Sequence, residues 1–66
     1  MLKIEGGTKI KEVSSAKFDI ALIELPSGRY CVVYECSGEL ISSEAVQDFK
    51  LASLMFDSKL IELEGH

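Results

Sequence analysis

Apolar residues in the middle of the chain follow the two-residue period of β-strands. The segment Lys17–Leu25 (KFDIALIEL) contains a phenylalanine and two isoleucines and lacks glycine and proline, which predicts a strand. Pro26-Ser27-Gly28 follows as a turn, because proline presets φ at the first corner and glycine accepts the left-handed conformation that a three-residue hairpin loop requires. Arg29–Cys36 (RYCVVYEC) is then the returning strand of a hairpin.

Weaker strand patterns flank this hairpin. Thr8–Val13 carries three charges and is expected to be an exposed or edge strand, where lysines discourage unwanted pairing. Leu2–Glu5 is short, alternates apolar and charged residues, and ends at Gly6-Gly7. Glu39–Ile41 is a candidate for a short fourth strand.

The hairpin loop also predicts a register. A three-residue loop pairs Leu25 with Arg29, and Asp19 then lies opposite Glu35, a mildly unfavourable pair of like charges. One face of the hairpin carries Phe18, Ile20, Leu22, Tyr30, Val32 and Tyr34, and the other carries Ala21, Ile23, Leu25, Cys31 and Val33. A hairpin with one solvated face should alternate apolar and polar residues, so both faces of this one are expected to be covered.

The spacing changes to a helical period in the C-terminal third. Ser42 or Ser43 can cap a helix over 43–63, and Glu44 and Asp48 would lie near the positive end of its dipole. One helical face carries Val46, Phe49, Ser53, Phe56, Leu60 and Leu63. A second interpretation ends the helix near Asp57-Ser58 and makes Lys59–Leu63 a strand. The continuous helix is preferred, because no glycine or proline interrupts the segment.

These elements predict one α+β domain over residues 1–66. It consists of an antiparallel three- or four-stranded meander followed by one C-terminal helix packed on the sheet. Domains of this size bury only about 60% of the surface of the unfolded chain and are marginally stable. Oligomerisation is one common way for such a domain to gain stability.

The predicted helix has more apolar surface than one sheet can cover. Four apolar residues lie roughly opposite the first stripe: Leu51, Leu54, Met55 and Ile61. A contiguous apolar patch of this kind is typical of an interface. We therefore expect a non-enzymatic protein-interaction module, a homodimer or the binder of a protein partner, with these four residues at the interface.

The charge distribution bears on a second hypothesis, binding of single-stranded nucleic acid. Two tyrosines on one sheet face could stack bases if basic residues flanked them. The residues concerned are Lys9, Lys11, Lys17, Arg29, Tyr30 and Tyr34. The net charge of −4 disfavours a polyanionic partner, and residues 31–66 hold seven acidic residues against two basic ones. Nucleic-acid binding is therefore the alternative and not the leading expectation.

Catalytic and metal-binding patterns are weak, and no cofactor is expected. Cys31 and Cys36 would lie about 17 Å apart on one strand, too far for a disulfide. The only histidine is the last residue, His66, so a nucleophile would lack a positioned base. No stretch of about 18 apolar residues or signal-peptide core is present, and a cytoplasmic location without membrane association is the default expectation.

One resemblance concerns the order of elements. GRYCVVYECSGEL followed by SSEAVQDFKLASLMF resembles the layout of tryptophan-glycine-arginine-type domains, which are small, strand-rich and end in a helix. The chain contains no tryptophan. No residue role is carried over from that family.

Overall fold

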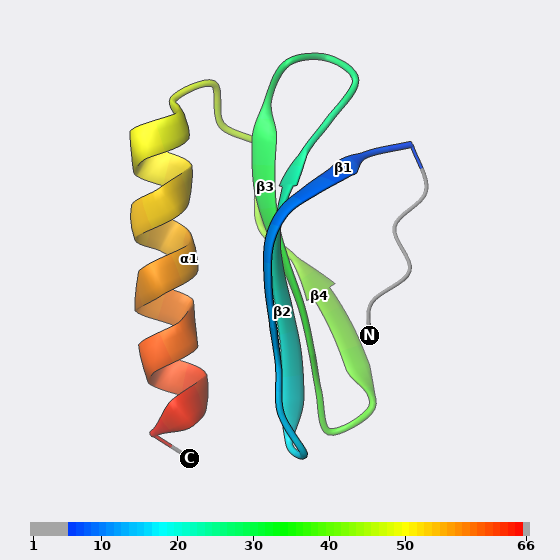
Figure 1. Ribbon diagram of the computed structural model, residues 1–66, viewed down its shortest axis with the longest axis vertical. Coiled ribbons are helices and arrows are strands. Elements are labelled where there is room, and N and C mark those ends of the chain that lie inside the picture. The colour runs from blue at the N-terminus through cyan, green and yellow to red at the C-terminus, as the bar shows by residue number, and fades with distance from the viewer. Residues whose placement is uncertain (1–5, 66) are drawn as a thin grey trace.

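The computed structural model describes residues 6–65 and contains one antiparallel sheet and one helix. The strands are β1 (Thr8–Ser14), β2 (Phe18–Glu24), β3 (Tyr30–Cys36) and β4 (Glu39–Ser42), arranged in the order β1-β2-β3-β4. The helix α1 (Phe49–Glu64) packs on one face of the sheet against β2 and β3 (Figure 1). The predicted α+β meander with a C-terminal helix is thus confirmed, with four strands. The predicted Leu2–Glu5 segment lies outside the described residues.

The central hairpin has the predicted register. Glu24 pairs with Tyr30 and Asp19 pairs with Glu35, and the Leu25 amide donates a hydrogen bond of 2.7 Å to the Arg29 carbonyl. Gly28 has a φ of 85°, in the left-handed region that the loop was expected to require. The Asp19 side chain accepts a hydrogen bond from Ser14, which lowers the pKa of its carboxyl despite the neighbouring Glu35.

Both apolar faces of the hairpin are buried, as expected. The face beneath α1 forms the main core, whose most buried members are Phe18, Ile20, Leu22, Val32, Ala52, Phe56 and Leu63. On the opposite face Ala21, Ile23, Cys31 and Val33 form a second buried cluster. These four are shielded from solvent within a single chain, whereas Leu40 of β4, which pairs with Glu35 on the same face, is 61% exposed.

The helix begins six residues later than predicted, at Phe49 instead of Ser43. Ser43 is held against β3, where its amide donates to the Val32 carbonyl and its hydroxyl accepts from the Val32 amide. Val46 then pairs with Tyr30 through two backbone hydrogen bonds of 2.8 Å. These bonds require extended backbone, so neither Ser42 nor Ser43 can cap the helix.

Asp48 is the actual N-cap. Its side chain accepts a hydrogen bond of 2.9 Å from the Lys50 amide, one of the amides that the first helical turn leaves without a partner. From there α1 continues through Asp57-Ser58 to Glu64. The alternative with a strand over Lys59–Leu63 is therefore wrong.

Candidate functional site

The helix α1 presents two different surfaces. Its inner surface carries Ala52, Phe56 and Leu63, which are buried against the sheet. At about 100° per residue, Leu54 lies on the opposite side of the helix from these three. The outer surface of α1 is therefore the part of the helix that the sheet does not cover.

Three of the four predicted interface residues lie on this outer surface. The exposed fractions are 46% for Leu51, 66% for Leu54 and 70% for Ile61. They are among the most exposed large apolar residues of the described chain. We call this set the outer stripe of α1.

Met55, the fourth predicted residue, differs from the other three. It is half-buried and packs against the main core. Its position, one residue after Leu54, turns it by about 100° toward the sheet. Met55 therefore contributes to the border of the outer stripe and not to its centre.

A shallow groove of about 420 Å³ lies along this border. Val32 and Tyr34 of β3 line one side of it, and Leu54, Met55 and Ser58 of α1 line the other. Most of this lining is apolar. The groove therefore extends the apolar outer stripe toward the sheet.

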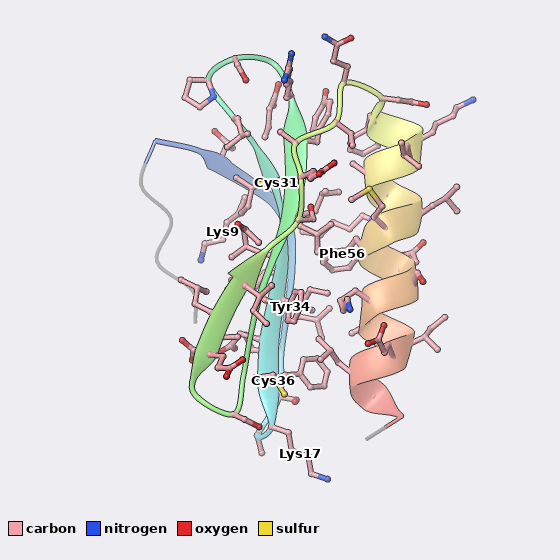
Figure 2. All side chains as sticks on the ribbon, turned by 180° about the vertical axis from the view of Figure 1, so that it is seen from behind. Lys9, Lys17, Cys31, Tyr34, Cys36 and Phe56 are labelled. Carbon is pink, nitrogen blue, oxygen red and sulfur yellow. The ribbon has the colours of Figure 1, made fainter. Side chains whose placement is uncertain are left out.

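Charged residues mark one end of the groove. The Lys59 ammonium lies 3.1 Å from a Glu62 carboxylate oxygen and 4.9 Å from the centre of the Tyr34 ring. The hydrogen bond with Glu62 raises the pKa of Lys59, and Tyr34 adds to this effect. The lysine is thus held in place by groups of its own chain (Figure 2 shows Tyr34 pointing toward α1).

The six residues of the nucleic-acid hypothesis are dispersed. The Tyr30 ring packs edge-on against Phe49, with 5.3 Å between centroids, and Tyr34 lies beneath Lys59. Both rings are thus engaged by α1. Lys17 and Arg29 precede β2 and β3 and lie at opposite ends of the antiparallel hairpin.

The two lysines of β1 point to different faces of the sheet. Lys9 pairs with Ile23 on the face away from α1 and forms an ion pair of 3.3 Å with Glu12 (Figure 2). Lys11 reaches the helix, where its ammonium lies 5.3 Å from the Phe56 ring centroid and 4.0 Å from Asp57. No single aromatic platform with a basic rim is formed by these residues.

Two exposed apolar residues of β4 were not anticipated from the sequence. Leu40 is 61% exposed and Ile41 is 40% exposed, and both belong to a four-residue strand at the edge of the sheet. Two adjacent apolar residues in so short a strand were the available signal, because successive side chains point to opposite faces and no neighbouring strand covers the edge.

The two cysteines are separate thiols and form no disulfide with each other. Cys31 and Cys36 are both free, Cys31 is buried, and burial raises the pKa of its thiol.

Within residues 6–65, no group of three or more His, Cys, Asp or Glu residues could hold a metal ion. In the same range, no helix combines the length and the hydropathy needed to cross a membrane.

The fold and the site define a small α+β domain, a four-stranded meander with one helix that exposes an apolar outer stripe. Comparisons of the chain with protein-family models, with curated proteins and with solved structures find no match. The geometry of the chain itself is therefore the basis for its proposed function.

Proposed function

We propose that this protein is a non-enzymatic interaction module of the cytoplasm that self-associates as a homodimer through the outer stripe of α1. The observation that carries the proposal is the exposure of Leu51, Leu54 and Ile61 on the side of the helix that faces away from the core. A soluble monomer commonly exposes single apolar residues, but aligned ones on one helical face are typical of an interface.

The outer stripe has no evident role within the monomer. The main core is built from the inner surface of α1 and one sheet face, and the opposite sheet face forms its own buried cluster. Polar residues at the three outer positions would leave both clusters in place. A role between chains explains why these positions are apolar.

The available apolar surface is consistent with a weak dimer. Fully burying a leucine or isoleucine contributes about 1.5–3 kcal/mol, so covering the exposed parts of the outer stripe in two copies would contribute about 5–11 kcal/mol. Association costs at least about 4 kcal/mol. The remainder, at most about 7 kcal/mol, corresponds to a dissociation constant near 10 μM or weaker.

A cytoplasmic location is part of this proposal. It is supported by the two free thiols, which a reducing compartment would preserve. The non-enzymatic assignment is supported by the burial of Cys31, which makes this thiol inaccessible as a nucleophile.

The proposal is tested by comparing two leucine variants in analytical ultracentrifugation. Leu54→Asp places a charge in the outer stripe, whereas Leu40→Asp places one at a similarly exposed leucine on β4. We expect Leu54→Asp to weaken dimerisation at least about tenfold, because it would bury an unpaired carboxylate. Leu40→Asp should leave the dissociation constant within about twofold, as expected for a substitution outside the interface.

Equal dissociation constants for wild type and Leu54→Asp would contradict the proposal. A loss of dimer in Leu40→Asp alone would place the interface on β4. Both variants alter exposed side chains, so circular dichroism should show an unchanged fold in each.

The alternative of single-stranded nucleic-acid binding has less support. Its two tyrosines are engaged by α1, and its basic residues lie on different surfaces. A fluorescence-anisotropy titration with single-stranded oligonucleotides at low salt distinguishes the two functions, and the homodimer proposal expects no binding at about 10–100 μM.

A further inference from the structure

Together with Ser58, the outer stripe of α1 has the spacing of a coiled-coil seam. Leu51, Leu54, Ser58 and Ile61 are separated by three, four and three residues, which is the spacing of successive a and d positions in a heptad. All four are exposed. We propose that α1 pairs with α1 of a second copy as an antiparallel, two-fold symmetric coiled coil, an inference that rests on the proposed homodimer.

The two-fold axis of such a pair passes between the two helices at the level of residue 56. An antiparallel seam pairs each a position with a d position of the other helix. Leu51 then packs against the partner's Ile61, and Leu54 packs against the partner's Ser58. Every member of the seam has a counterpart, and each contact occurs twice because the interface is isologous.

The charges beside the seam favour the antiparallel direction. Lys50 and Glu64 occupy flanking positions near the two ends of α1, and neither forms an ion pair within residues 6–65. In the antiparallel pair Lys50 lies beside the partner's Glu64, and the same contact repeats on the other side of the axis. Complementary charges at such flanking positions set the orientation of coiled-coil pairs.

Two kinds of like-charge contact arise in the antiparallel pair. Glu62, which is ion-paired with Lys59 of its own chain, approaches the partner's Asp48 on both sides of the axis. Near the axis Asp57 approaches the partner's Asp57, and the Lys11 ammonium of the same chain lies 4.0 Å from Asp57 as a counterion. Lys11 also lies over the Phe56 ring, which holds the ammonium at this part of the helix. Each copy therefore brings its own positive charge to the flank of α1 that carries Asp57.

The parallel arrangement is less favourable for the same set of residues. It would place Asp57 beside the partner's Glu62 on both sides of the pair and would leave Lys50 next to the partner's Met55. The parallel arrangement would also place the two helix dipoles side by side in the same direction, which is unfavourable. The antiparallel arrangement places them in opposite directions. Charge and dipole therefore point to the same direction of packing.

Site-directed cross-linking distinguishes the two directions. Leu51→Cys and Ile61→Cys are prepared separately in a Cys36→Ser background, where the remaining Cys31 is buried. The two proteins are mixed and treated with a thiol-reactive linker shorter than about 10 Å. In the antiparallel pair, equivalent residues 51 lie about 15 Å apart, so the linker joins the two different variants and not two copies of one.

The expected product is therefore the mixed cross-link in clear excess over both homodimeric products. Homodimeric cross-links in excess would show a parallel pair and would overturn the inference. Cross-links of neither kind, while the uncross-linked mixture still sediments as a dimer, would overturn the inference and leave the homodimer standing. Absence of any dimer in the wild type would overturn both.

A charge exchange gives an independent readout. Lys50→Glu and Glu64→Lys alone should each weaken the dimer by about three- to tenfold at low salt, and the double variant should recover the wild-type affinity. Asp57→Asn should strengthen the dimer, because it removes the like-charge contact near the axis. Additive losses in the double variant, or a weaker dimer for Asp57→Asn, would contradict the antiparallel pair.

Discussion

At the residue scale, the two cysteines of β3 differ in their surroundings although they belong to the same strand. Cys31 points to the face away from α1 and is buried with Ala21, Ile23 and Val33. Cys36 lies at the end of β3, half-buried against the main core. Five residues of extended backbone place them on opposite faces, so they act as independent thiols.

This difference predicts unequal thiol reactivity. Burial raises the pKa of Cys31, so less of the reactive thiolate is present near pH 8 than for an ordinary cysteine. We expect a disulfide reagent to modify Cys36 at least about tenfold faster than Cys31, because the buried thiol also requires an opening of the fold. The measurement is the time course of modification of the wild type, with Cys36→Ser as control, which should lose only the fast phase.

The same shift has a consequence for stability. Below the ordinary thiol pKa, the Cys31 thiol is neutral in both the folded and the unfolded protein, and its burial carries no penalty. As the pH rises above that value, the thiol ionises more readily in the unfolded protein, so the free energy of unfolding decreases.

Equal reaction rates of the two thiols would contradict this description of the Cys31 environment.

At the scale of the elements, the start of α1 is determined by competition between a helix and a sheet. Ser43 and Val46 bond with β3, so the chain stays extended up to Asp48. Asp48 then supplies the cap. The bonds with β3 and the Asp48 cap together therefore determine where the helix begins.

Substitution of the cap tests this account. Asp48→Ala should destabilise the protein by about 1 kcal/mol in urea unfolding, because the Lys50 amide loses its acceptor. Asp48→Asn keeps an acceptor oxygen and should cost much less. Ser42→Ala, at the position that the sequence offered as a cap, should change the stability by less than about 0.5 kcal/mol. A larger loss for Ser42→Ala than for Asp48→Ala would contradict the assignment.

The same elements show which features the sequence predicts. The hairpin register follows from local information, because the loop length and the alternation of side chains both act within about 20 residues. The helix start depends on hydrogen bonds between residues 43–46 and a strand formed earlier in the chain, which local propensity does not contain.

The candidate site was predictable to a similar degree. Helical periodicity identified Leu51, Leu54 and Ile61 as outward-facing. It could not place Met55, whose burial depends on where the helix lies relative to β3. It also gave no reason to consider Leu40 and Ile41, whose exposure follows from the position of β4 at the edge of the sheet.

At the scale of the whole molecule, the monomer has two layers, a sheet and a helix (Figure 1). Pairing of two α1 helices would give four layers, with a sheet on each outside and two helices between them. The helices then become the interior of the assembly, and the outer stripe becomes part of a second core. This arrangement uses the surplus apolar surface without altering the monomer.

The central claim is that the outer stripe of α1 holds two copies together. The most direct measurement is the light-scattering mass of the wild-type protein across concentrations from about 1 μM to about 500 μM, a range that begins below the tightest expected dissociation constant and extends well above it. The account predicts a mass that rises from the 7.3 kDa of one chain toward twice that value. A mass that stays at 7.3 kDa over the whole range would contradict it.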